Sequence, residues 1–264
     1  MTDGLTAYGG GMAEVEIMTP RGVTLAGTFE PGDGNSAVLF AHGFLADRHS
    51  SLRFDILASA YRTAGHATLQ IDFSGCGASG EDVVTVAGEV EDLRSASAWL
   101  AEHDYPDQIV HAHSFGTLAA LRSRPRDVAA MVLTGPIMGP MSYPWEEIFS
   151  AEQLEDLERH GYARIPDDNE AAAREYSVIS KQTLADYSLI DPAELLEHVE
   201  VPVLLLHGAD DEDGDELVEL SREALPLLPE GSRLEIVDAD GNHRLDAAAE
   251  VALSWAAEHL TRAA

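Results

Sequence analysis

The sequence predicts an α/β fold, in which helices cover both faces of a mostly parallel sheet. Short β-branched and apolar runs alternate with amphipathic segments along most of the chain, which is typical of this architecture. The 264 residues are 45% apolar, enough to bury a sizeable core in one large domain. We find no internal repeat or low-complexity linker, so a single domain over residues 1–264 is expected.

The elements follow one another in a regular order. A turn at Pro20 to Gly22 joins the first two strands, and a Pro- and Gly-rich cluster at 31–35 precedes the third. Strands are expected at 14–18, 23–29, 37–41, 66–73, 108–113, 129–133, 201–207 and 233–237. Helices are expected at 51–64, 86–103, 114–123, 216–227 and 246–262.

Residues 138–200 interrupt this order. The segment reads as mainly helical and carries several aromatic residues. A stretch of this length without a strand of the main sheet is more typical of an insertion than of a structureless loop. Ligands of open α/β sheets bind at the carboxyl ends of the strands, so we expect a helical cap over that edge.

The charge composition is strongly acidic. Asp and Glu number 47 against 16 Lys and Arg, which gives a formal net charge of −31. Such a chain is repelled by the phosphates of nucleic acids and by anionic membranes, so neither is an expected partner. The first residues lack the basic and apolar regions of a signal peptide, and no apolar run is long enough to span a bilayer, so a cytoplasmic location is expected.

Adaptation to high salt is our hypothesis for this charge. Self-repulsion of a highly charged compact state is strongest in dilute buffer, and salt screens it. The free energy of unfolding should therefore rise between dilute buffer and molar salt, as measured by urea denaturation. A free energy that stays constant or falls would contradict the hypothesis.

The strongest chemical signal is the stretch from Ala112 to Gly116, between an expected strand and an expected helix. Small residues two positions before and after Ser114 permit the sharp strand-to-helix turn that exposes a nucleophilic hydroxyl. The usual pattern has glycine at both positions, and a methyl group at Ala112 is the smallest departure from it. The sequence thus predicts Ser114 as a nucleophile.

A serine hydroxyl needs a base, and the base needs an acidic partner. His243 follows the last expected strand, in a loop before the final helix, whereas His66, His111 and His113 lie on or beside strands and are expected to pack. Asp211 comes just past the end of another buried strand, with Asp210 as the alternate. We therefore predict His243 as the general base and Asp211 as its partner.

Donors for an oxyanion are expected after the strand that ends at Ala41. In the turn that follows, His42 and Gly43 would shape the backbone, while the N–H groups of Phe44 and Phe115 would bind the oxyanion. The glycine-rich stretch 72–80 lacks the pattern of a phosphate-binding loop. Neither a cofactor nor a metal is expected, and the single cysteine, Cys76, reads as a small packing residue.

Together these motifs resemble the α/β-hydrolase superfamily from about residue 14 to residue 260. Within it, the chain is similar to small cinnamoyl/feruloyl-esterase-like members and to the serine aminopeptidase and monoacylglycerol-lipase-like group. The similarity is carried by residues 42–44, 72–79, 113–116, 206–211 and 241–243. The order Ser, Asp, His agrees with this superfamily. Residues 212–215 lack its common apolar-Pro ending, which leaves Asp210 and Asp211 both open.

The resemblance implies an eight-stranded, mostly parallel sheet, no cofactor and a two-step reaction through an acyl-enzyme. The expected function is hydrolysis of small-molecule carboxylic esters of small to medium acyl or aromatic acids. A peptidase, thioesterase, lactonase or C–C bond hydrolase would use the same residues and stays open. A catalytically silent ligand-binding protein on this scaffold is the alternative from another class, and the oligomeric state is left open.

Overall fold

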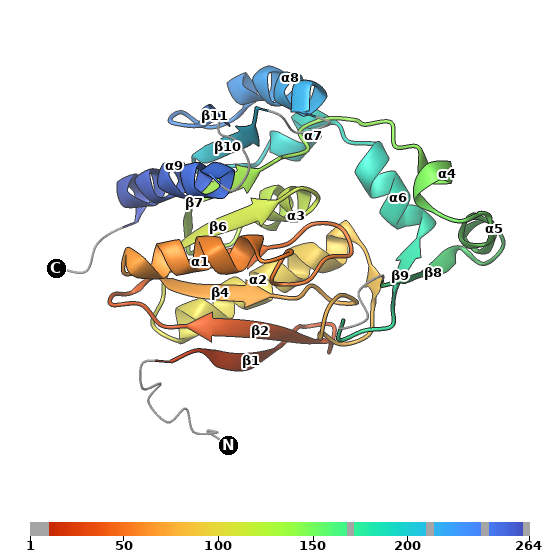
Figure 1. Ribbon diagram of the computed structural model, residues 1–264, viewed down its shortest axis with the longest axis horizontal. Coiled ribbons are helices and arrows are strands. Elements are labelled where there is room, and N and C mark those ends of the chain that lie inside the picture. The colour runs from red at the N-terminus through yellow and green to blue at the C-terminus, as the bar shows by residue number, and fades with distance from the viewer. Residues whose placement is uncertain (1–10, 168–171, 210–213, 239–242, 261–264) are drawn as a thin grey trace.

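An eight-stranded sheet forms the centre of the computed structural model, which describes residues 11–167, 172–209, 214–238 and 243–260 (Figure 1). The strands run in the order β1-β2-β4-β3-β6-β7-β10-β11. Pairing of β1 with β2 and of β2 with β4 is antiparallel, and every later pair is parallel. Their bounds are β1 (Ala13–Met18), β2 (Thr24–Glu30), β3 (Ser36–Ala41), β4 (Ala67–Ile71), β6 (Asp107–His113), β7 (Val128–Thr134), β10 (Val203–Gly208) and β11 (Arg233–Val237).

Helices cover both faces of this sheet. One face carries α1 (Arg53–Thr63) and α9 (His243–His259). The other carries α2 (Val86–Glu102), α3 (Gly116–Ser123) and α8 (Gly214–Ala224), which a short 3-10 helix at Leu225–Leu227 extends. The prediction of a mostly parallel α/β sheet is therefore confirmed.

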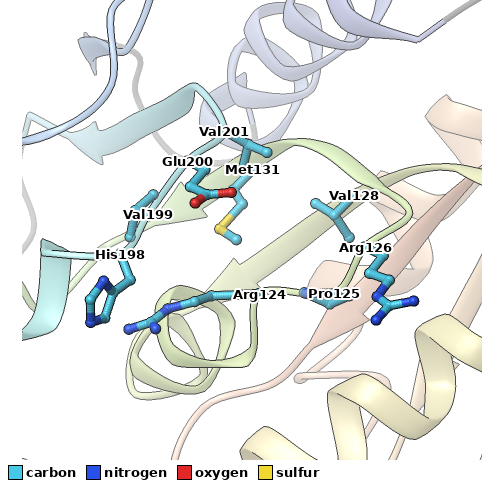
Figure 2. A pocket seen from close by; sticks show the side chains of 9 residues that line it. All are labelled: Arg124, Pro125, Arg126, Val128, Met131, His198, Val199, Glu200 and Val201. Atoms are coloured by element: carbon cyan, nitrogen blue, oxygen red, sulfur yellow. The ribbon is translucent and has the colours of Figure 1, made fainter.

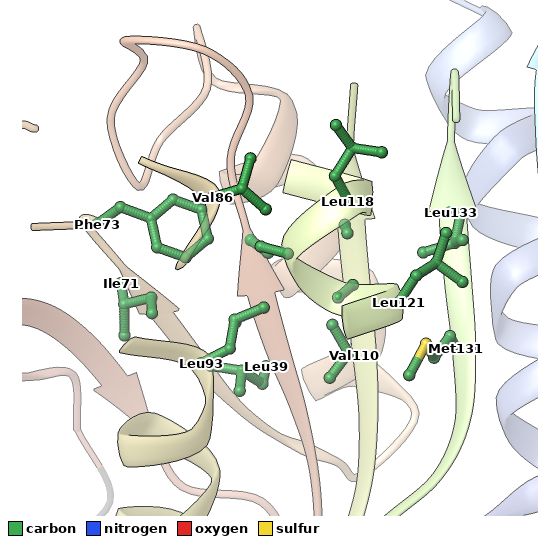
Figure 3. Close-up of a cluster of buried hydrophobic side chains, with 14 of the residues drawn as sticks. Leu39, Ile71, Phe73, Val86, Leu93, Val110, Leu118, Leu121, Met131 and Leu133 are labelled. Atoms are coloured by element: carbon green, nitrogen blue, oxygen red, sulfur yellow. The ribbon is translucent and has the colours of Figure 1, made fainter. Parts of the chain in front are cut away.

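The larger part of the core lies between the sheet and the face formed by α2 and α3. Figure 3 shows Leu39 of β3 beside Leu93 of α2, with Val110 of β6 and Leu118 of α3 in the same cluster. All four side chains are fully buried. Strands β3 and β4 are buried at every residue, because helices cover both of their faces, and this explains the apolar run from Ala37 to Ala41 in β3.

Residues 138–200, here called the insert and predicted to be mainly helical, contain strands as well as helices. Besides α4 (Trp145–Ile148), α5 (Ala151–His160), α6 (Lys181–Ser188) and α7 (Pro192–Leu196), they contain two strands, β8 (Tyr162–Pro166) and β9 (Tyr176–Ser180). These pair with each other and with β5 (Val83–Val84) in a second, three-stranded sheet. The sequence did not predict these strands, because they have five residues each and β9 pairs with a distant dipeptide.

Local sequence signals fix the helices of the insert. Ser150 and Gln153 form a reciprocal capping box at the start of α5, and Gly161 ends that helix with a φ of 84°. Asp191 accepts the amide N–H groups of Ala193 and Glu194 at the start of α7. None of the helices in the described part of the chain is long and apolar enough to cross a membrane.

Candidate active site

Ser114 occupies a sharp turn between the end of β6 and the start of α3. Its φ of 51° lies in the left-handed region, which is uncommon for a residue with a side chain. The turn is held on both sides, because the Ser114 N–H donates to Thr134 O at 3.0 Å and its carbonyl accepts from Thr117 N at 3.0 Å. The backbone conformation that the sequence pattern requires is therefore present.

Gly116 lets this turn approach the loop after β3. A Cβ atom at Gly116 would lie 2.2 Å from the carbonyl oxygen of His42 and 2.7 Å from that of Ala41, closer than real side chains come. Ala112, in the position of the other usual glycine, is completely buried within the core. Only the second glycine of the pattern is thus indispensable in this chain.

The loop at 42–44 borders the Ser114 side chain. A Cβ atom at Gly43 would lie 3.3 Å from Ser114 Cβ and 3.8 Å from its Oγ. In the described part of the chain, no hydrogen bond uses the amide N–H of Phe44 or Phe115 as donor. Two backbone donors near the serine are therefore available to an external oxygen.

The His42 side chain holds this loop in place and takes up no proton. Its Nε2 accepts the Phe73 amide N–H at 3.0 Å, and its Nδ1 lies 2.8 Å from Gly43 O as a donor. Burial lowers the pKa of His42, although Gly43 and the charges of Asp72 and Asp47 act in the opposite direction. The imidazole is therefore held neutral, as expected for a residue that shapes a turn.

Ser114 lines a cavity of about 240 Å³ at the carboxyl ends of the parallel strands. Thr134 of β7, Gly208 of β10, Val237 of β11 and Arg244 of α9 also line it. Asp210 and Asp211 lie outside the described residues. The sequence predicted His243 in a loop, but it is the first residue of α9.

His113 contributes to this cavity, which the sequence did not predict. It is half-buried, and its Nδ1 lies 3.1 Å from both the carbonyl oxygen and the hydroxyl of Thr134. The predicted packing role is confirmed for His111, which is fully buried and stacked on Phe40. Burial, with smaller effects of His113 and Arg53, lowers the pKa of His111 to about 3.

Aromatic side chains of the insert pack on both loop phenylalanines. The Tyr187 ring centroid lies 4.1 Å from that of Phe115 and 5.2 Å from that of Phe44. Tyr143 lies 5.4 Å from Phe115, and Phe149 lies 6.5 Å from Phe44. The insert therefore contacts both residues whose amides border Ser114.

A buried carboxyl group lies beneath this cluster. Glu89 of α2 is 3% exposed, and Tyr187 donates its hydroxyl to Glu89 Oε1 at 3.5 Å. Burial, followed by repulsion from Asp92, raises the pKa of Glu89 well above its usual range, and Asp186 acts in the same direction. The folded protein therefore favours the neutral acid.

Replacing Glu89 by glutamine should stabilise the protein increasingly as the pH rises. Because the carboxyl pKa is raised on folding, the unfolded state loses this proton first, and wild-type stability falls above the unfolded pKa near 4.5. The limiting slope is about 1.4 kcal/mol for each pH unit. Urea denaturation between pH 5 and 8 measures the difference. Glu102→Gln, an exposed position on the same helix, should show no such growth, and a pH-independent difference for Glu89→Gln would contradict the expectation.

The glycine-rich stretch forms a turn around Asp72. The Asp72 carboxylate accepts the Ala78 N–H at 2.8 Å and contacts the Arg48 guanidinium at 3.0 Å. A Cβ at Gly77 would lie 2.3 Å from the same carboxyl carbon. The stretch is thus built around a carboxylate rather than around a phosphate. Among the described residues, no three potential metal ligands lie together.

Solved structures share this fold at low sequence identity. DcsB, solved with a substrate analogue, has a TM-score of 0.76 at 17% identity, over 95% of this chain and 100% of that one. The alpha/beta hydrolase GrgF from Penicillium sp. sh18 gives 0.75 at 16%, over 95% and 99%. An esterase from Pyrococcus furiosus gives 0.73 at 17%, over 95% and 92%. Each likeness concerns the fold alone.

Sequence comparison identifies the family. Curated proteins give no significant match. The profile of the alpha/beta hydrolase family matches residues 38–253, most of the chain, including most of β3, the turn at Ser114 and the insert. The match agrees with the strand order and with the left-handed serine between β6 and α3. The chain therefore belongs to the alpha/beta hydrolase family.

Proposed function

We propose that this protein is a serine hydrolase that cleaves small-molecule carboxylic esters of small to medium acyl or aromatic acids. Ser114 is the nucleophile, His243 the general base and Asp211 its partner. The observation that carries the proposal is the left-handed conformation of Ser114 in a strand-to-helix turn that opens into a cavity. That conformation is costly for serine, by about 1–3 kcal/mol, so its occurrence at a cavity favours a chemical role.

The proposed reaction has two steps. Ser114 Oγ attacks the ester carbonyl carbon while His243 takes the hydroxyl proton, and the N–H groups of Phe44 and Phe115 bind the oxyanion. Collapse breaks the bond to the alcohol, which leaves with the proton from His243. A water activated by His243 then hydrolyses the acyl-enzyme, releasing the acid and restoring Ser114.

The residues that line the cavity support the choice of Asp211 and His243 as partners of Ser114. Gly208 lies shortly before Asp211 in the chain, Arg244 directly follows His243, and both line the same cavity as Ser114. This proximity in the sequence supports Asp211 and His243 as partners of Ser114. The cavity of about 240 Å³ suits a small ester better than a long acyl chain.

The insert is proposed to act as a cap on this site. Its Tyr187, Tyr143 and Phe149 rings pack on Phe44 and Phe115, so the insert limits the space beside the oxyanion donors. Tyr187 is fully buried, which makes it a fixed wall of the cap.

Covalent labelling tests the proposal directly. The wild-type protein in molar salt is treated with a fluorophosphonate probe, and peptide mapping locates the added mass. We expect one label per chain, on Ser114, and turnover of short p-nitrophenyl or aromatic esters. Folded protein that neither labels nor hydrolyses any ester of the panel would favour a silent ligand-binding protein and overturn the proposal.

A further inference from the structure

A second cavity, of about 460 Å³, lies at the amino ends of the parallel strands, whereas Ser114 lies at their carboxyl ends. Figure 2 shows the residues that line it. Val128 at the start of β7 lines it, whereas Thr134 at the end of the same strand lines the Ser114 cavity. A strand of this length separates the two cavities by roughly 20 Å. The second cavity is therefore no part of the proposed catalytic site.

The walls of this cavity combine an apolar floor with charged groups on its rim. Val128, Met131 and Val201 supply the floor. In Figure 2, Arg124 extends toward His198 on one side, and Glu200 lies over Met131. Arg126 lies on the other side, so basic groups flank the cavity and an apolar surface lies between them.

Arg124 and Arg126, which both line this cavity, form no ion pair in the described part of the chain. Eight of the 16 Lys and Arg are paired with carboxylates in the described part of the chain, namely Arg21, Arg48, Arg62, Arg159, Arg174, Lys181, Arg222 and Arg233. Within the described residues, Arg124 forms no ion pair, although 47 acidic residues compete for 16 Lys and Arg. His198 is half-exposed, with its Nε2 3.6 Å from Glu197 Oε2.

Local structure gives no reason for arginine at this position. Arg124 caps the end of α3 with φ 47° and ψ 55°, in the left-handed region. Glycine and asparagine are the residues that favour this conformation at the end of a helix. An arginine there must tolerate backbone strain, so its side chain is the feature that needs an explanation.

We propose that this cavity binds a small organic anion, a carboxylate or phosphate monoester carried on an apolar body. Arg124 pairs with the anion through its planar guanidinium, which matches both groups. His198 adds a donor, and the apolar body covers Met131 and Val128. Glu200, which lies over Met131, repels the anion and so favours its binding beside the arginines. The net charge of −31 repels an anion at longer range. In molar salt the Debye length is about 3 Å, so this repulsion is screened.

Binding of 2-naphthoate by the intact protein in 1 M NaCl tests this inference, with 2-naphthyl phosphate and neutral 2-naphthamide as comparison ligands. Calorimetric titration should show saturable binding of the carboxylate, the phosphate or both, at least tenfold tighter than the amide. Arg124→Gly should weaken anion binding at least tenfold without lowering Tm, because glycine suits the left-handed position. Val201→Trp, which fills the cavity, should remove binding.

Arg122→Gln is the matched control, since Arg122 is a nearby cation of α3 that does not line the cavity. It should leave the affinity within twofold of wild type. Absence of saturable anion binding, equal affinity for the amide, or equal loss in Arg122→Gln and Arg124→Gly would overturn the proposal. A lowered Tm of Arg124→Gly with unchanged affinity would assign Arg124 a structural role instead.

Discussion

Ser114→Ala should lower kcat/KM for the best ester substrate by a factor of about 10⁴ to 10⁶, because loss of the nucleophile leaves only binding and oxyanion stabilisation. Alanine removes a single oxygen and leaves the turn intact, since the hydrogen bonds that hold the turn to Thr134 and Thr117 are made by the backbone. Steady-state assays in molar salt measure the loss, and the thermal melting temperature should stay within a few degrees of wild type.

Ser51→Ala is the control for this variant. Ser51 has a φ of 55°, the same backbone region as Ser114, but it is exposed and does not line the Ser114 cavity. Its kcat/KM should equal that of wild type. If Ser114→Ala retained a tenth or more of the wild-type rate, the nucleophile would have to be another residue.

Gly116→Ala should cost about 3 kcal/mol of stability or more, because the added methyl group has no space and the neighbouring backbone must move. The nearest atoms are the carbonyl oxygens of His42 and Ala41, which belong to the main chain and cannot rotate away. Movement there would also displace Phe44 from the serine. We therefore expect a lower midpoint of urea denaturation together with reduced ester turnover.

Gly139→Ala provides a matched glycine replacement. A Cβ at Gly139 would approach Leu220 Cδ2 to 2.8 Å, but this atom is the flexible end of a side chain. The cost should stay below about 1.5 kcal/mol, since a side chain in the core can repack. Equal costs at the two glycines would show that the close approach at Gly116 does not constrain the turn.

The main sheet was predictable because its signals are local. Strands such as β3 and β10 are continuous apolar runs bounded by turn residues, and their ends were predicted to within two residues. The strands of the insert were missed because β5 has only two residues and becomes a strand through pairing with β9 far along the chain. Such pairing leaves no periodic signal in either segment.

The candidate site also has features that the sequence predicts and features that it does not. Ser114 and the loop at 42–44 were predictable, since a strand, a turn and small residues occur together at each. The role of His113 was not, because its strand position favours packing and only the contact with Thr134 places it at the cavity. Arg124 and His198 are distant in the sequence and become neighbours through the pairing of β7 with β10.

The second sheet also limits how this protein can be recombined with its relatives. The strand β9 of the insert is hydrogen-bonded to β5, which belongs to the chain before α2, and Thr183 donates to the Val84 carbonyl at 2.6 Å. A chimera that exchanged residues 138–200 alone would leave β5 without its matching partner and β9 paired with β8 only. Residues 72–84 and the insert therefore form one transferable unit, and a designer who alters substrate range by exchanging modules should move them together.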